Sequence, residues 1–259
     1  MNTRDMLIPY FSFPILDGLG RRHTGPEIMD VATLPFSTTQ KVYKNLSMVN
    51  SILGVDGPSL LFVKKFIEDH PNQKSLRILD IGCGQGDKLR KIQALLLKKG
   101  VEAQLVGVDL NEDVVKSATK SSGPNCDIQF LAKNVYDFDE TVKFDIVLCT
   151  NVLHHLSDED ILKLIKWSEH RSEAFFFIDL YRSALTFIGW WTLCHTLLSF
   201  FGAIIRTDGF LSIKKSFREA DFVNYVHKLS FNTGKTIIKK QGLFFLSMTH
   251  YSHCTEVNL

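Results

Sequence analysis

Between Leu76 and residue 182 the chain alternates short, continuous apolar runs with longer amphipathic stretches. The runs, each predicted as a strand, are Leu76–Ile81, Ala103–Val108, Asp127–Leu131, Phe144–Cys149 and Ala174–Ile178. The stretches predicted as helices between them are Lys88–Lys99, Glu112–Lys120 and Asp158–His170. Strands that are apolar on both faces are buried on both faces, so the pattern indicates an α/β fold with a parallel sheet covered by helices on each side.

The C-terminal part predicts a different strand arrangement. Ser216-x-x-Glu219 reads as a capping box that opens a helix running to about Leu229. Two strands, Thr236–Ile238 and Leu243–Tyr251, follow and are joined by residues 239–242. That connection is too short for a helical crossover, so the pair must be antiparallel. We therefore expect a mostly parallel seven-stranded sheet with an antiparallel C-terminal hairpin.

Residues 1–70 are predicted as an N-terminal arm followed by two lid helices, Thr38–Leu53 and Pro58–His70. Residues 71–259 are predicted as one domain with a helical insertion at about 183–212.

The insertion contains an unusually apolar stretch, Ala184–Ile205, which spans 22 residues and has His195 as its only group that charges near neutral pH. A bilayer crossing needs about 20 apolar residues. However, strands on both sides belong to one sheet, so the stretch is predicted as one or two lid helices. Its aromatic residues are Phe187, Trp190, Trp191, Phe200 and Phe201. Such a lid implies an apolar ligand. Contact of the lid with a membrane surface is the other interpretation of its apolar side chains. Phe187→Ser or Trp191→Ser is expected to weaken binding of that ligand.

Composition excludes several classes of protein. A net charge of +2, with no long run of one sign, lacks the electrostatic footprint of a nucleic-acid binder. The cysteines Cys83, Cys126, Cys149, Cys194 and Cys254 show no paired spacing. Neither a disulfide framework nor a metal site is therefore expected. The N-terminal residues lack the layout of a signal peptide, and a cytoplasmic location is expected.

The strongest local motif is the turn after the first predicted strand, Asp80-Ile81-Gly82-Cys83-Gly84-Gln85-Gly86. Glycines at alternate positions allow a ligand to approach the backbone. A dinucleotide site would show G-x-G-x-x-G with a pyrophosphate at the helix N-terminus. Here the third glycine comes one residue early, and Asp80 would repel a pyrophosphate. The same carboxylate suits the ammonium and sulfonium groups of S-adenosylmethionine. A nicotinamide-dependent oxidoreductase remains the alternative.

The second strand ends at Asp109, whose carboxylate can accept hydrogen bonds from both ribose hydroxyls in either cofactor class.

Together the glycine turn, Gly107–Leu110, Phe144–Val147 and Val152–Leu156 resemble the class I S-adenosylmethionine-dependent methyltransferases grouped with ubiquinone and menaquinone biosynthesis. The resemblance covers roughly residues 74–182. The segments Pro26–Asp30, Asp179–Ser183 and Arg206–Ser212 are similar to a bacterial subgroup that accompanies aromatic polyketide or pigment biosynthesis.

The resemblance implies a Rossmann-like class I methyltransferase fold and a set of cofactor-binding positions. Those for the methionine end are Asp80, Gly82, Cys83, Gly84 and Gly86, with Thr150 and Asn151 lining the same pocket. Those for the ribose and adenine are Asp109, Leu110, Asn134 and Val135. Asn134 stands where the family usually has an acid, and its amide oxygen can still accept a hydrogen bond from the adenine amino group.

Methyl transfer is an in-line displacement in which the protein aligns the reactants and excludes water. A general base is needed when the acceptor is a phenol or enol. His154 and His155 are the candidates; because they are adjacent, at most one is expected to face the acceptor, and packing or capping of the following helix is the alternative role. His195, Tyr181, Asp208 and His227 are secondary candidates.

The sequence thus favours O-methylation of a small lipophilic acceptor that is aromatic or phenolic, with C-methylation open. A non-catalytic, membrane-associated protein that binds S-adenosylmethionine is the alternative from a different class.

Overall fold

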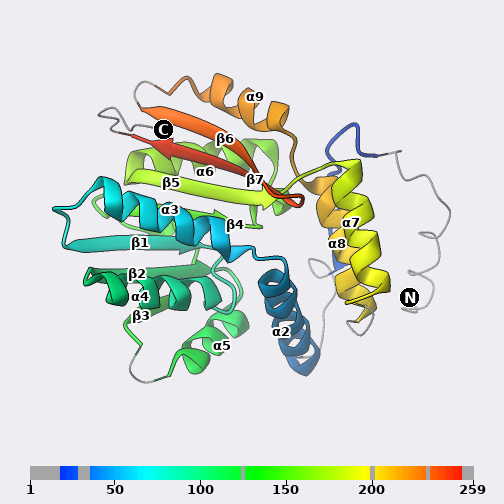
Figure 1. Ribbon diagram of the computed structural model, residues 1–259, viewed down its shortest axis with the longest axis horizontal. Helices are drawn as coiled ribbons and strands as arrows, with labels where there is room; N and C mark the ends of the chain where they lie inside the picture. Colours follow the sequence, from blue (N-terminus) through cyan, green and yellow to red (C-terminus); the bar gives the residue numbers. More distant parts are fainter. Residues whose placement is uncertain (1–17, 29–35, 124–125, 199–201, 232–233, 253–259) are drawn as a thin grey trace.

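The computed structural model describes residues 18–28, 36–123, 126–198, 202–231 and 234–252. Its seven strands form one sheet in the order β3-β2-β1-β4-β5-β7-β6. The strands are β1 (Ser75–Ile81), β2 (Glu102–Asp109), β3 (Ile128–Ala132), β4 (Phe144–Thr150), β5 (Ser172–Leu180), β6 (Lys235–Gln241) and β7 (Phe245–Tyr251). The first five pair in parallel, and β7 runs antiparallel to both β5 and β6. The predicted sheet is confirmed (Figure 1).

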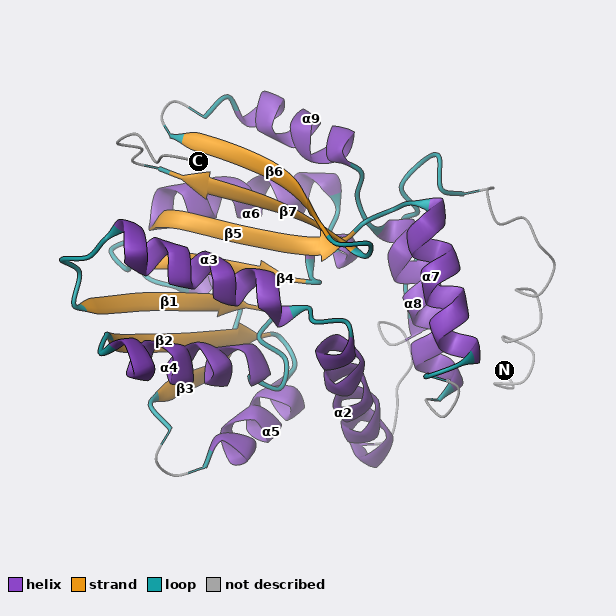
Figure 2. Ribbon diagram, viewed as in Figure 1, coloured by secondary structure: helices purple, strands orange, loops and turns teal. Residues whose placement is uncertain are grey.

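Helices cover both faces of the sheet (Figure 2). They are α2 (Phe36–Ile52), α3 (Asp56–Asp69), α4 (Asp87–Lys99), α5 (Glu112–Ser122), α6 (Asp158–Arg171), α7 (Ala184–His195), α8 (Ala203–Lys215) and α9 (Glu219–Leu229), with the short 3₁₀ turns η2 (Val135–Asp137) and η3 (Leu153–His155). Helices α3 and α4 pack on one face, and α6 and α9 pack on the other. Alternate strand residues divide between these two cores: Ile78 faces the first and Leu79 the second.

Several C-terminal boundaries differ from the prediction, among them the start of β7 at Phe245 instead of Leu243. Ser216 does not cap α9, because its hydroxyl donates to the carbonyl of Ile213 at 2.7 Å at the end of α8. The helix begins at Glu219, where the Asp221 carboxylate accepts the backbone N–H of Arg218 at 2.7 Å. Strand β6 also continues through Gln241. Its Lys239 and Lys240 are exposed on an edge strand, where charged residues discourage pairing with other chains.

The apolar insertion forms two packed helices, α7 and α8, which lie beyond the carboxyl ends of the parallel strands (Figure 1). A third core joins Trp190 and Ile205 of this pair to Leu19 of the N-terminal arm and Val49 of α2. Trp191, which the sequence suggested as a ligand-facing residue, does not line the cavity described below. It is 42% exposed and stacks on His195, whereas Trp190 is buried. Phe200 and Phe201 lie outside the described residues.

Within the described ranges, no single helix combines the length and apolarity needed to span a membrane; only the bent pair Lys41–Ile52 and Asp56–Asp69 does so, by length and composition alone.

Candidate functional site

A cavity of about 1060 Å³ lies at the carboxyl ends of the parallel strands, walled by the strand ends, α2, α7 and α8. The chain order of the strands reverses between β1 and β4, so the loops after these two strands diverge and leave a crevice. The volume is at the upper end of the roughly 300–1,000 Å³ found for small-molecule sites. The cavity therefore has room for two ligands side by side.

The glycine turn forms one wall of this cavity. Gly82 has a φ of +66°, and a Cβ atom there would lie 2.3 Å from Cγ2 of Val152. A larger residue there would have to displace the Val152 side chain and would adopt a left-handed backbone conformation. The amides of Gly82 and Cys83 donate to the carbonyl of Val108 at 2.8 and 3.0 Å, which fixes the turn against β2. Gly86 does not line the cavity; it has a φ of +76° and caps α4.

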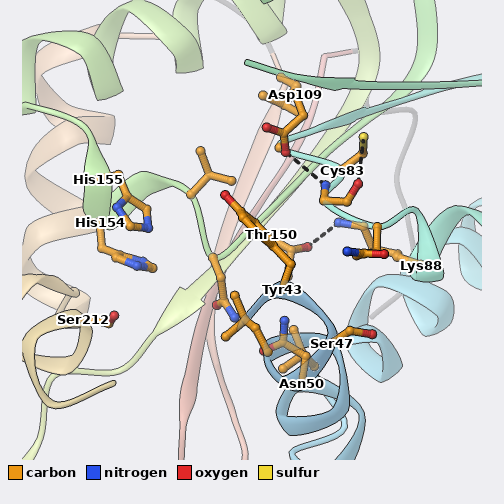
Figure 3. Close-up of a pocket in the computed structure, with 18 of the residues that line it drawn as sticks. Tyr43, Ser47, Asn50, Cys83, Lys88, Asp109, Thr150, His154, His155 and Ser212 are labelled. Carbon is orange, nitrogen blue, oxygen red and sulfur yellow. Dashed lines mark hydrogen bonds between the residues drawn. The ribbon is translucent and has the colours of Figure 1, made fainter. Parts of the chain in front are cut away.

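Asp109 presents its carboxylate at the end of β2 (Figure 3). Oδ2 accepts the amide of Gly84 at 3.1 Å, and Oδ1 accepts the amide of Asn111 at 3.0 Å. Each carboxylate oxygen keeps a second acceptor position. Leu110 beside it lines the cavity and is 75% exposed, which makes it an apolar surface at the cavity mouth.

Asn134 and Val135 lie on the cavity wall, where the sequence predicted them. Asn134 also has a structural role. Its amide oxygen accepts the backbone N–H of Tyr136 at 3.1 Å and so caps η2. Asn151, after β4, has a φ of +54°, and its buried Oδ1 has no hydrogen-bond partner in the described part of the chain. This orphaned acceptor on the cavity wall suits a ligand that donates a hydrogen bond.

Asp80 is not the solitary carboxylate that the sequence suggested. The ammonium of Lys88 lies 2.7 Å from Asp80 Oδ1 and donates to Thr150 Oγ1 at 2.6 Å (Figure 3). Burial raises the pKa of Asp80 to about 6, against the opposing attraction of Lys88. Lys88 was missed by sequence reasoning, although a lysine in the first turn of the helix behind a glycine loop was a usable signal.

His154 lies on the opposite wall and is held at one ring nitrogen. Its Nδ1 is 2.7 Å from Asp179 Oδ1, and its backbone N–H donates to Asp179 Oδ2 at 3.1 Å. Burial alone would lower the pKa of His154; the charge and hydrogen bond of Asp179, together with Glu27, outweigh burial and raise this pKa above its usual 6.5. Its Nε2 lies 3.6 Å from Glu27 Oε1.

The rings of His154 and His155 lie 4.2 Å apart between centroids, and both residues border the cavity (Figure 3). The expectation that at most one of them faces the acceptor stays a prediction, since bordering the cavity does not place either ring against a ligand. Ligand atoms of Glu27, His154 and His155 lie within 4.8 Å of one another, a composition that could hold a metal ion. The Lys215 ammonium is 3.3 Å from Glu27 Oε1, so the carboxylate of this group is already paired with a positive charge.

Sequence reasoning missed the contributions of Glu27 and Asp179. Asp179 had a signal, since it is an acid near the carboxyl end of a parallel strand, as Asp80 and Asp109 are. Of the secondary candidates, Asp208 borders the cavity and accepts the backbone N–H of Ile28 at 2.9 Å. Tyr181, His195 and His227 do not line it.

Comparison with known proteins defines the class. Residues 78–169 match a family described as "Methyltransferase domain". The fold matches the plantazolicin methyltransferase BpumL, crystallised with S-adenosylhomocysteine, with a TM-score of 0.65, 14% identity, and coverage of 83% of this chain and 91% of that one. The chain has the class I S-adenosylmethionine-dependent methyltransferase fold, and S-adenosylmethionine is the cofactor of that class. The fold class and cofactor predicted from the sequence are confirmed.

Two curated relatives each match part of the chain. The ubiquinone biosynthesis O-methyltransferase of Idiomarina loihiensis is 33% identical over 97 residues, which is 36% of this chain and 37% of that protein. A malonyl-[acyl-carrier protein] O-methyltransferase of Ilyobacter polytropus is 23% identical over 124 residues, 48% of this chain and 42% of that protein. The chain thus spans about two fifths of the length of these relatives.

The described residues fit the cofactor. The backbone at Gly84 faces open space, Asp109 retains acceptor positions for ribose hydroxyls, and Asn151 offers a buried acceptor.

Proposed function

We propose that this protein transfers the methyl group of S-adenosylmethionine to a hydroxyl of a small, lipophilic acceptor, which is aromatic or phenolic. The observation that best supports this proposal is that two walls face the same cavity. One wall, the cofactor wall, is made by the glycine turn and Asp109. On the other wall a histidine is paired with a buried carboxylate. A nicotinamide cofactor is disfavoured because the third glycine of the turn, Gly86, comes one residue before the last glycine of a dinucleotide-binding motif.

In this proposal the cofactor lies along the carboxyl ends of β1 and β2. Asp109 accepts hydrogen bonds from the ribose hydroxyls, and Leu110 and Val135 pack against the adenine. The backbone of the Gly82–Gly84 turn, with Thr150 and Asn151, encloses the methionine end. The amide oxygen of Asn134 accepts a hydrogen bond from the adenine amino group, using the acceptor position that its capping hydrogen bond leaves free.

The acceptor occupies the rest of the cavity, against the lid. The side chains that line this part are largely apolar: Val152, Leu156, Leu180, Trp190, Ile205 and Ile213. A ligand pocket of this kind derives affinity from apolar burial and orientation from a few polar groups. The polar groups present are Glu27, His154, His155 and Asp208. That a relative is named as a ubiquinone biosynthesis O-methyltransferase agrees with such an acceptor.

The cofactor supplies a methyl group on positively charged sulfur, which leaves as a neutral thioether. The protein's part is to deprotonate the acceptor and align it. Nε2 of His154 takes the hydroxyl proton, while Asp179 holds the imidazole by Nδ1 and stabilises its charged form. When bound, the cofactor would supply the methyl carbon, and the acceptor oxygen aligned by these residues would displace the neutral thioether from it. The lid keeps water from competing.

The first experiment measures binding of S-adenosylhomocysteine and of NAD by calorimetry, and methyl transfer from labelled S-adenosylmethionine to a panel of phenols and alkyl phenols. We expect binding of S-adenosylhomocysteine alone and transfer to at least one phenol. Binding of NAD, or binding of S-adenosylhomocysteine without transfer to any phenol, lipid extract or thiol, would refute an active phenol methyltransferase.

The lid offers a matched pair of variants for the acceptor site. Trp190→Ser changes the cavity wall, whereas Trp191→Ser changes a neighbouring tryptophan that is 42% exposed on the outer side. Trp190→Ser is expected to raise the KM for the acceptor about tenfold or more, since most of a buried aromatic surface is lost, and to leave the Kd of S-adenosylhomocysteine within about twofold. If the two variants had equal effects on the KM for the acceptor, the acceptor would not bind in this part of the cavity.

A further inference from the structure

An acid of the N-terminal arm faces the imidazole that the proposed function uses as a base. Glu27 is 4% exposed, and its Oε1 lies 3.6 Å from Nε2 of His154. The arm is anchored on both sides of this acid. Before it, Arg22 donates to backbone carbonyls in and just after η3; after it, the backbone N–H of Ile28 donates to Asp208 in α8 at 2.9 Å. A carboxylate fixed beside one atom of the base must affect the proton that this atom takes up.

The neutral and charged forms of His154 meet Glu27 differently. An ionised carboxylate can only accept, so in the neutral ring Nδ1 donates its proton to Asp179 Oδ1 at 2.7 Å and Nε2 carries a lone pair. That lone pair and the carboxylate of Glu27 are both acceptors, and they repel each other. Once Nε2 has taken a proton, the same contact joins a positive N–H to a carboxylate and becomes attractive. Glu27 therefore favours the charged ring.

Lys215 limits this effect. Its ammonium is 4% exposed and lies 3.3 Å from the same Oε1, so it balances the charge of Glu27 and offsets part of its action on the ring. Among the described residues, the titratable groups around His154 come from four elements: Asp179 in β5, Glu27 in the arm, Lys215 in α8 and His155 in η3. The two acids favour the charged ring and the lysine disfavours it.

We propose that Glu27 is a positioning residue that stabilises the imidazolium formed when Nε2 of His154 takes the hydroxyl proton of the acceptor, with Lys215 setting the strength of this effect. The inference rests on the proposed function and gives the N-terminal arm a part in proton transfer. The acceptor O–H bond breaks, an N–H bond forms at Nε2, and the acceptor oxygen keeps the electron pair. The positive charge of the ring then lies between the carboxylates of Asp179 and Glu27. A base whose charged form is stabilised deprotonates a weakly acidic hydroxyl more readily.

The first test measures kcat against pH for an alkyl phenol and for a nitrophenol, which ionises near neutral pH without a base. Glu27→Gln keeps the shape of the side chain and removes its charge. We expect the acid side of the kcat profile to move to lower pH, because the charged ring loses one of its two acids. On the plateau, kcat for the alkyl phenol should fall about 3–10-fold, a fraction of what a general base contributes. For the nitrophenol it should change less than about twofold.

Lys215→Met should move the same profile in the opposite direction, to higher pH. A loosened arm would not produce opposite shifts in the two variants. Lys215→Met leaves Glu27 as a buried charge, so the double variant Glu27→Gln/Lys215→Met, which removes both charges, keeps the test valid if the single variant is unstable. Its profile should lie between those of the single variants. Glu159→Gln, an identical change at an exposed position of α6, is the control and should leave the profile in place.

Titration of the His154 imidazole by NMR separates this inference from the proposed function, because it needs no methyl transfer. The pKa of His154 should fall in Glu27→Gln and rise in Lys215→Met. If this pKa stayed unchanged in Glu27→Gln, or if kcat fell equally for both phenols, Glu27 would have no part in proton transfer. If the pKa shifted as expected but the wild type methylated no phenol, the proposed function would fail, and the assigned step with it.

Discussion

At the scale of single residues, the pairing of His154 with Asp179 sets a pH dependence. Because the pKa of His154 is raised above 6.5 and a general base must be neutral, the rate should be low below this pKa and rise as pH increases through it. The kcat profile of the wild type should therefore have an acid limb centred above pH 6.5. His154→Ala should lower kcat about 100-fold or more.

Asp179→Asn removes the charge that outweighs burial of His154. The acid limb should move to lower pH, and kcat should fall because the imidazole loses its orienting acceptor. His155→Ala, which alters the neighbouring ring, is the matched control and should leave the position of the limb unchanged. A limb that stays in place in Asp179→Asn would exclude His154 as the titrating base.

The buried carboxyl of Asp80 predicts a second pH effect, in ligand binding. Its pKa is raised to about 6, so below that pH it is protonated and loses its attraction for an ammonium group. The affinity for S-adenosylhomocysteine should increase as pH rises from 5 to 7, with a midpoint near 6. Methylthioadenosine, which has no ammonium, should show no such change. Calorimetry at five pH values checks this, and parallel curves for both ligands would contradict it.

Some of these residues could be predicted from the sequence and some could not. Asp80 and Asp109 end apolar strands, and the carboxyl ends of parallel strands converge at one edge, so local pattern sufficed. The glycine turn could also be predicted from its local sequence motif. The pairing of Glu27 with His154 could not be predicted, because it depends on how distant segments of the chain pack.

At the scale of elements, the lid depends on a close approach of its two helices. A Cβ atom at Gly209 of α8 would lie 2.2 Å from the indole of Trp190 in α7. Gly209→Ala should therefore force the helices apart and lower the free energy of unfolding by about 1–3 kcal/mol, as overpacking does. Since both residues line the cavity, the KM for the acceptor should also increase.

Gly202→Ala is the control for that variant, since a Cβ at the N-terminal end of the same helix meets nothing within 4 Å. Urea unfolding and steady-state kinetics would make the comparison. An unchanged KM in Gly209→Ala, with stability reduced, would mean that the helix pair supports the fold without shaping the acceptor site.

Prediction at this scale succeeded where local periodicity decides the structure. The strands were located within a few residues because they are continuous apolar runs, and the helices that cover the sheet because each has a buried and an exposed face. Helix α7 is apolar on all sides, including Leu185 and Ile188 that the structure leaves exposed, so its sequence could not tell which face meets the ligand. The choice between Trp190 and Trp191 was settled by packing against α8.

At the scale of the whole molecule, the proposed acceptor site is assembled from parts far apart in the chain. Glu27 comes from the N-terminal arm, His154 follows β4, and Asp208 lies in α8. Ion pairs and hydrogen bonds between such distant residues produce no periodic pattern in the sequence, so these contacts could not be predicted from it. The cofactor wall, by contrast, is built mainly from one continuous stretch between β1 and β4, which is the part that resembles known methyltransferases.

Arg22 links these separate parts and carries the last prediction. Its guanidinium donates to the carbonyl of Lys215 at 2.8 Å, to the carboxylate of Asp158 at 2.6 Å, and to the carbonyl of Leu156 at 2.6 Å just after η3. Arg22→Ala leaves carbonyl acceptors without their donor, so the free energy of unfolding should fall by about 2 kcal/mol. Because η3 carries His154, kcat should fall about tenfold through loss of alignment.

The cofactor wall does not contact Arg22, so the Kd of S-adenosylhomocysteine should change by less than about twofold in Arg22→Ala. The neighbouring Arg21 is exposed, and Arg21→Ala removes the same charge without these bonds. If the two variants lowered kcat equally, net charge would be responsible and the arm would have no part in the acceptor site. If Arg22→Ala weakened cofactor binding as much as turnover, the two halves of the cavity would form a single cooperative unit, contrary to the division argued from their contacts.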